Sequence, residues 1–268
     1  MRVARGGGKE ALDGLSARAG RLTATERATQ ATYDAAADRW AAARDDDVFW
    51  SAEHARYAEL LPPPARVFDL GCGAGRDLGP LKERVYEVIG ADLSAAMLRL
   101  ARRRHPGVRL MRASLYELPF EDGSLDGVWS AATLLHVPHG RLAEALAEIR
   151  RVLRPGGVAF CSVKPGEGER MVEGDLGARF FAFHDADGFA FSEAGFDVAR
   201  VERLERAGAE WITLFARRGR WSAPRHAGKR KRAKASDPHP RYPVGESNPC
   251  FRRERAASWT TRRTGRVV

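Results

Sequence analysis

Short apolar runs along the chain alternate with segments whose apolar residues recur at helical spacing. The runs predict strands at 65–70, 86–92, 108–111, 125–130 and 158–164. Because strand and helix alternate at this spacing, we expect parallel β-α-β units with right-handed crossovers. Two further runs, at 196–204 and 210–215, are joined through Gly208 and predict an antiparallel edge hairpin. The expected fold is an α/β three-layer αβα sandwich with a doubly wound, mostly parallel seven-stranded sheet.

The chain before the first strand predicts two amphipathic helices. One carries Tyr33, Ala36, Ala37 and Trp40 at i, i+3, i+4 and i+7, and the other extends over 49–61 until a run of three prolines ends it. Residues 1–24 show no sustained period and are expected to be a disordered leader. We therefore expect one domain over 25–216, with 25–61 as its N-terminal helical cap.

The charge of the chain is divided unevenly. Residues 217–268 hold 16 Lys and Arg against 3 Asp and Glu, which leaves 29 against 32, or −3, in the other 216 residues. The net charge of +10 therefore belongs to the tail and says nothing about what the domain binds. The tail, 217–268, has no hydrophobic period and is expected to be disordered. It is either a non-specific nucleic-acid tether or an extension without a role, and we favour the latter.

Three cysteines, Cys72, Cys161 and Cys250, show no paired spacing, and the first two are expected to be reduced, small and buried. No apolar stretch reaches 18 residues, and no apolar h-region follows the first charged residues. We expect a soluble cytoplasmic protein that does not bind membranes.

The strongest signal is the stretch Asp69-Leu70-Gly71-Cys72-Gly73-Ala74-Gly75 between the first strand and the next helix. Alternating glycines allow positive φ and let a ligand approach the main chain. The dinucleotide fingerprint needs a small residue where this chain has Arg76, which argues against a pyrophosphate. Asp92 follows the second strand, about 20 residues after the first glycine, where an acid can accept hydrogen bonds from ribose hydroxyls.

Together with 118–120 and 153–157, these residues resemble the class I S-adenosylmethionine-dependent methyltransferases over roughly residues 33–217. The resemblance implies S-adenosylmethionine as the cofactor and transfer of its methyl group to an oxygen, nitrogen or sulfur of a small molecule. The residues that it marks for cofactor binding are Asp69, Gly71, Gly73, Gly75, Asp92, Leu93, Met97, Ser114, Leu115 and Ser130.

Their roles follow from the resemblance as well. The glycines hold the methionine part, Asp69 and the Ser130 carbonyl meet its ammonium, and Asp92 holds the ribose, while the apolar residues sandwich adenine. Ser114 stands where the family usually has an acid that binds the adenine amino group, so backbone groups at Ser114 and Leu115 are expected to replace it. No metal site is expected.

The acceptor side is less defined. His136 lies just past the fourth strand, either as a general base or as a hydrogen-bonded cap beside a helix start, and we favour the cap. The N-terminal helices cover the cofactor and wall the acceptor pocket, or merely pack on the core. Charged residues of 164–170 beside the aromatics of 179–184 line the acceptor pocket or form a solvated loop, and we favour the loop.

Three other classes of protein stay open. A nicotinamide-dependent oxidoreductase shares the β-α-β start, but Arg76 and the lack of proton-relay residues count against it. A nucleic-acid methyltransferase would use the basic tail, yet the domain is acidic and shows no Asn/Asp-Pro-Pro-aromatic signature. The third is a cofactor-binding protein without catalysis.

Overall fold

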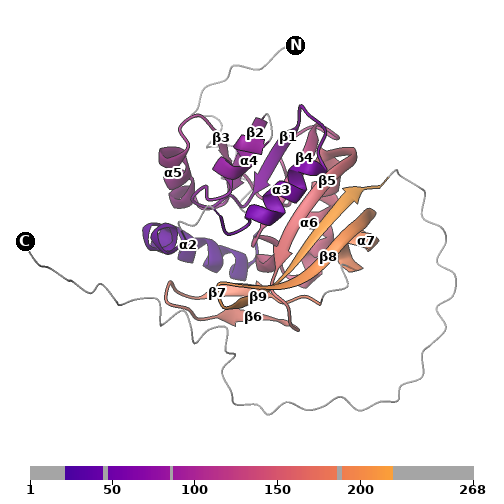
Figure 1. Ribbon diagram of the computed structural model, residues 1–268. Coiled ribbons are helices and arrows are strands. Elements are labelled where there is room, and N and C mark those ends of the chain that lie inside the picture. The colour runs from indigo at the N-terminus through magenta and orange to yellow at the C-terminus, as the bar shows by residue number, and fades with distance from the viewer. Residues whose placement is uncertain (1–21, 45–47, 85–86, 186–188, 220–268) are drawn as a thin grey trace, which may run out of the picture.

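The computed structural model describes residues 22–44, 48–84, 87–185 and 189–219 (Figure 1). The expected leader, except for its last three residues, and the tail from residue 220 lie outside this part of the chain. So does Cys250, whereas Cys72 and Cys161 are buried free thiols, as expected. Within the described residues, no helix combines the length and the apolarity needed to cross a membrane.

The main sheet has seven strands in the order β3-β2-β1-β4-β5-β9-β8. These strands are β1 (Arg66–Leu70), β2 (Glu87–Asp92), β3 (Arg109–Arg112), β4 (Leu125–Ala131), β5 (Leu153–Val163), β8 (Phe196–Arg206) and β9 (Ala209–Arg218). Strands β1 to β5 pair in parallel, and β9 pairs antiparallel with both β5 and β8. The predicted parallel sheet with a C-terminal antiparallel hairpin is confirmed.

Helices cover both faces of this sheet (Figure 1). They are α2 (Ala24–Ala43), α3 (Ser51–Glu59), α4 (Leu78–Arg84), α5 (Ala95–Arg104), the 3-10 helix η2 (Leu134–His136), α6 (His139–Val152) and the short α7 (Phe189–Glu193). Two hydrophobic clusters form the core, one on each face of the sheet, and neighbouring residues of β1 belong to different ones. Val67 packs with residues of α3 and α4, and Phe68 packs with residues of α6. Strands buried on both faces need apolar residues at successive positions, which explains the continuous apolar runs.

The β8–β9 hairpin turns through Ala207 and Gly208, which have φ of 52° and 71°. Two residues with positive φ form the turn whose twist matches that of paired antiparallel strands. The turn brings Arg206 opposite Ala209 and sets the register of the hairpin as far as Arg200, beyond which the pairing shifts by one residue.

Helix α2 is held to α5 and to β7 (Arg179–Ala182) by polar contacts (Figure 1). The Asp34 carboxylate accepts hydrogen bonds from Ser94 Oγ at 2.6 Å and from the Ala96 amide at 3.1 Å. On the other side, Thr32 Oγ1 donates to the Ala178 carbonyl at 2.6 Å. The helix therefore bridges two elements that lie far apart in the sequence.

The segment after β5 is not the solvated loop that we favoured. Strands β6 (Glu169–Val172) and β7 form a separate antiparallel pair. All four residues of β7 are buried, so their backbone groups need hydrogen-bond partners, which the pairing with β6 supplies in part. The Phe180 amide finds a further partner in Thr29 Oγ1 on α2, at 2.8 Å.

The predicted start of the tail at residue 217 is also wrong, because β9 continues through Arg218. Arg217 pairs with Val158 of β5 and donates to the carbonyls of Gly156 and Leu60, at 3.1 and 3.3 Å. The boundary was set by charge, whereas these arginines use their charge-bearing groups to bind backbone carbonyls of the domain.

We predict that a chain ending at Gly219 unfolds at nearly the same temperature as the full chain, whereas a chain ending at Ala216 unfolds several degrees lower. The shorter chain loses the last β9 pairs and the arginine hydrogen bonds, each worth about 0.5–1.5 kcal/mol. Thermal unfolding followed by circular dichroism compares the two. If both truncated chains unfold at equally lowered temperatures, the residues after 219 contribute to the stability of the domain.

Candidate cofactor and acceptor site

The turn after β1 leaves no room for a side chain at Gly71. Gly71 has φ of 77°, and a Cβ placed on it would lie 2.1 Å from Thr133 Oγ1. The amides of Gly71 and Cys72 both donate to the Ala91 carbonyl of β2 at 2.8 Å. The turn is therefore fixed between β2 and the residues that follow β4.

Asp92 lies at the carboxyl end of β2 and is half-buried. Its two carboxylate oxygens accept hydrogen bonds from the Gly73 amide at 2.9 Å and the Ser94 amide at 2.8 Å. Burial raises the pKa of Asp92, and the two amides oppose that rise. Each oxygen keeps a second lone pair with which it can accept a further hydrogen bond.

A cavity of about 670 Å³ opens beside this turn. The predicted residues that line it are Gly71, Gly73, Asp92, Leu93, Met97, Leu115 and His136. A Cβ built on Gly73 would meet no protein atom within 4 Å, so the space above this residue belongs to the cavity. The volume lies within the range of about 300–1,000 Å³ that ligand pockets usually have.

Four predicted residues lie outside the lining of this cavity. Asp69 is buried in β1, and Ser130 is buried in β4 opposite Cys161. The Gly75 carbonyl accepts a hydrogen bond from His105 Nε2 at 2.7 Å, and Ser114 Oγ accepts one from the Tyr116 amide at 3.3 Å. The contact of these four residues with the cofactor stays a prediction.

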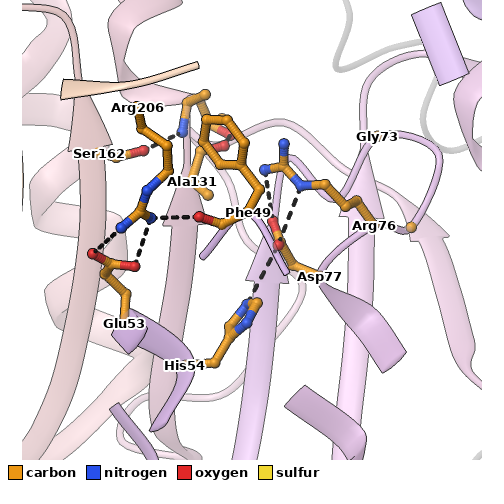
Figure 2. Close-up of polar contacts among 12 residues, drawn as sticks. Phe49, Glu53, His54, Gly73, Arg76, Asp77, Ala131, Ser162 and Arg206 are labelled. Atoms are coloured by element: carbon orange, nitrogen blue, oxygen red, sulfur yellow. Dashed lines mark hydrogen bonds and ion pairs between the residues drawn. The ribbon is translucent and has the colours of Figure 1, made fainter. Parts of the chain in front are cut away.

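Asp77, Arg76 and His54 form a polar group behind the turn (Figure 2), and the buried Asp69 interacts electrostatically with Asp77 and Arg76. Burial and the neighbouring Asp77 raise the pKa of Asp69 well above its usual value. Burial would also raise the pKa of Asp77, but the Arg76 guanidinium at 3.1 Å and His54 at 3.3 Å lower it overall. Asp77 is thus the stronger acid of the two, and its carboxylate pairs with Arg76.

A second arginine lies on the other side of the Phe49 ring (Figure 2). Arg206 forms a two-pronged ion pair with Glu53, at 2.7 and 3.1 Å. The pair joins the end of β8 to α3. Both Arg76 and Arg206 line the cavity, and each has a carboxylate partner on the protein.

His136 is not the helix cap that we favoured, since its ring bonds elsewhere. Its Nδ1 lies 2.6 Å from the Phe180 carbonyl, which can only accept, so this nitrogen carries the proton. Its Nε2 then accepts from the Tyr33 hydroxyl at 2.8 Å. Burial lowers the pKa of His136 to about 4, and the charge of Arg179 lowers it as well. The imidazole is neutral at pH 7.

Sequence reasoning left the position of the N-terminal helices open, placed Arg179 and Phe181 either in the acceptor pocket or in a solvated loop, and did not assign Trp211 to the site. Tyr33 and Trp40 of α2 line the cavity, so this helix covers the site rather than only packing on the core. Arg179, Phe181 and Trp211 line it too, although Glu167 and Arg170 of the same polar stretch do not. The aromatic run 179–184 was the available signal, but only the β6–β7 pairing shows which of its residues face the cavity.

The residues present fit S-adenosylmethionine. The space above Gly73 accommodates a ligand along the main chain, and Asp92 presents a carboxylate with free acceptor capacity. Leu93, Met97 and Leu115 supply apolar surface for a base. The described residues contain no group of three or more His, Cys, Asp or Glu side chains that could hold a metal ion.

Residues 67–157 match the family model described as a methyltransferase domain. This segment contains the turn, Asp92 and His136. The chain belongs to the class I S-adenosylmethionine-dependent methyltransferases. The cofactor of this family is S-adenosylmethionine.

Solved methyltransferases share the fold of this family member. A Burkholderia thailandensis 1,6-didemethyltoxoflavin-N1-methyltransferase, with its acceptor and S-adenosylhomocysteine bound, is 23% identical with a TM-score of 0.62, over 74% of this chain and 92% of that one. An S-adenosylmethionine-dependent methyltransferase of Methanosarcina mazei is 20% identical with a TM-score of 0.54, over 60% of this chain and 95% of that one. At these identities the likeness shows the fold alone.

Curated relatives match over shorter stretches. A malonyl-[acyl-carrier protein] O-methyltransferase of Halorhodospira halophila is 36% identical over 189 residues, which is 66% of this chain and 56% of that protein. A demethylmenaquinone methyltransferase of Renibacterium salmoninarum is 35% identical over 95 residues, which is 35% of this chain and 39% of that protein. The chain thus spans about two fifths to just over half the length of these relatives.

We predict that His136 makes stability depend on pH in mildly acid solution. The unfolded histidine binds a proton near pH 6.5 and the folded one near pH 4, so the stabilisation is complete above about 6.5 and falls as the pH drops toward 4. The slope is at most about 1.4 kcal/mol per pH unit. Urea unfolding at pH 7 and pH 5 measures the free energy of unfolding at each pH. The decrease between pH 7 and pH 5 should be smaller in His136→Gln than in the wild type.

His139→Gln serves as the control for the loss of an imidazole near the site, because the His139 side chain is 42% exposed and contacts Glu169 and the Phe183 carbonyl rather than His136. If the free energy of unfolding decreases between pH 7 and pH 5 as much in His136→Gln as in the wild type, the neutral, buried state of His136 is contradicted.

Proposed function

We propose that this protein transfers the methyl group of S-adenosylmethionine to an oxygen, nitrogen or sulfur atom of a small molecule. The observation that supports this most is a single cavity whose lining includes Gly73 and Asp92 together with Tyr33, His136 and Phe181. A cofactor at the glycine end and an acceptor at the histidine end would share it. Methyl transfer requires such contact between the two.

In the cofactor half, the backbone at Gly71 and Gly73 follows the methionine part, and Asp92 accepts hydrogen bonds from the ribose hydroxyls. Leu93, Met97 and Leu115 enclose the adenine. When bound, the cofactor supplies a methyl group on a sulfonium, whose leaving group is neutral. The protein therefore mainly needs to align the acceptor and exclude water, which fits a cavity covered by α2.

In the acceptor half, Tyr33 and His136 take up the proton that a hydroxyl, amine or thiol loses. The Tyr33 hydroxyl lines the cavity and already donates to His136 Nε2. As the Tyr33 oxygen accepts a proton from the acceptor, its own proton passes to Nε2, and Nδ1 stays bonded to the Phe180 carbonyl. The neutral state of His136 leaves its Nε2 lone pair available for this step.

The comparisons support the small-molecule choice, since the Burkholderia thailandensis protein is named for a small-molecule acceptor. The rival functions, a nicotinamide-dependent oxidoreductase and a nucleic-acid methyltransferase, gain nothing from the site. Arg76 is paired with Asp77 beside the glycine turn, where a pyrophosphate would need a small residue.

Calorimetry tests the cofactor class first. We expect S-adenosylmethionine and S-adenosylhomocysteine to bind and NAD to give no heat, because Asp92 and the glycine turn suit a single nucleoside. Labelled methyl transfer into fractionated metabolite extracts then identifies the acceptor. Binding of NAD, with no heat from either sulfur compound, would refute the proposal.

We predict that Asp92→Asn weakens S-adenosylhomocysteine binding by about tenfold or more while the protein stays folded. An amide cannot accept two charged hydrogen bonds from the ribose, each worth about 1.5–3 kcal/mol at most, and about 1.4 kcal/mol is one decade in affinity. Asp122→Asn, at an exposed acid paired with Arg151, is the control. An unchanged dissociation constant in folded Asp92→Asn would place the ribose elsewhere.

A further inference from the structure

One buried arginine of the cavity has no carboxylate partner. Arg179 lies on β7, lines the cavity and is only 4% exposed. Its Nε is buried without a hydrogen-bond acceptor, and no described Asp or Glu lies within ion-pair distance of its guanidinium. Buried charges in proteins are normally paired, because leaving water costs free energy that a lone charge does not recover.

Aromatic rings surround this guanidinium in place of an acid. Its Cζ lies 4.6 Å from the ring centre of Trp40, 5.4 Å from that of Phe181 and 5.9 Å from that of Tyr33. Ring faces attract a cation, and the Tyr33 hydroxyl offers it a hydrogen bond, but neither supplies the negative charge of a carboxylate. The other two arginines considered above differ, since Arg76 pairs with Asp77 and Arg206 with Glu53.

The position of Arg179 favours the acceptor over the cofactor as the source of the missing anion. Arg179 adjoins Tyr33, whose hydroxyl bonds to His136, and Phe181, whose ring packs against that of His136. The cation that acts on Asp69, behind the glycine turn, is Arg76. The cofactor's own carboxylate belongs with the methionine part at the glycine end.

We propose, on the basis of the proposed methyl transfer, that Arg179 binds a carboxylate of the methyl acceptor, which makes the acceptor a small organic acid. The planar guanidinium matches a carboxylate through two parallel hydrogen bonds. With its acid group held there, the acceptor has its other end beside Tyr33 and His136. Trp40 and Phe181 then flank the acid from the sides of the guanidinium.

Matched acids and amides test this by calorimetry, with and without saturating S-adenosylhomocysteine. The probes are benzoate, salicylate, mandelate and glycolate, each beside its primary amide. We expect the wild type to bind acids at least about tenfold more tightly than their amides. Arg179→Gln should abolish this preference. Arg170→Gln, at an exposed arginine on the paired strand β6 outside the cavity lining, should keep it.

Two results would overturn the proposal directly. One is a wild type that binds no acid more tightly than its amide, and the other is an Arg179→Gln protein that keeps the preference. If Arg179→Gln fails to fold, Arg179→Lys replaces it, because an ammonium cannot form the parallel pair and the preference should fall severalfold. An unchanged preference in that variant would equally overturn the proposal.

The same titrations separate this proposal from the proposed function. If Arg179→Gln weakens the binding of S-adenosylhomocysteine as much as it weakens the binding of the acids, the guanidinium holds the cofactor's carboxylate and the proposal fails. If the wild type does not bind S-adenosylhomocysteine, the methyltransferase function fails. The titrations of the acids in the absence of S-adenosylhomocysteine still decide whether Arg179 binds a carboxylate.

Discussion

The close approach of Gly71 to Thr133 fixes the geometry of the site. Thr133 Oγ1 donates to the Leu70 carbonyl at 3.0 Å, just where a Cβ at position 71 would lie. The Gly71 amide meanwhile donates to the Ala91 carbonyl. The carboxyl ends of β1, β2 and β4 are thus held together at one point. Thr133 also precedes η2, so the placement of His136 depends on the absence of a side chain at Gly71.

Helix α2 connects the two halves of the cavity, and it does so through polar contacts. Gln30 Nε2 donates to the Leu93 carbonyl at 3.3 Å in the cofactor half, while Tyr33 binds His136 in the acceptor half. The buried apolar surface of the helix is small, since Ala36 and Ala37 are its only buried apolar residues. Its position is therefore set by hydrogen bonds to α5 and β7 together with the partly buried Tyr33 and Trp40, which pack beside Met97.

Local patterns predicted the sheet because each strand and turn is encoded within a few residues of itself. The residues around the acceptor could not be predicted in this way. Tyr33 and His136 are 103 positions apart, and Thr29 and Phe180 are 151 apart, so only the folded chain brings each pair together. The pleat of β1 directs Asp69 toward the face with Val67 and α4, and its contact with the cofactor stays a prediction.

The charge state of the acceptor half suits the proposed chemistry. Burial keeps His136 neutral, so its ring does not repel a sulfonium cation bound nearby. In the proposed reaction His136 gains a positive charge as the departing sulfur loses one, and the number of positive charges in the cavity stays constant. A carboxylate on Arg179 would further neutralise a buried cation that otherwise faces only aromatic rings. The same burial that makes a lone charge costly thus favours an acceptor that carries its own anion.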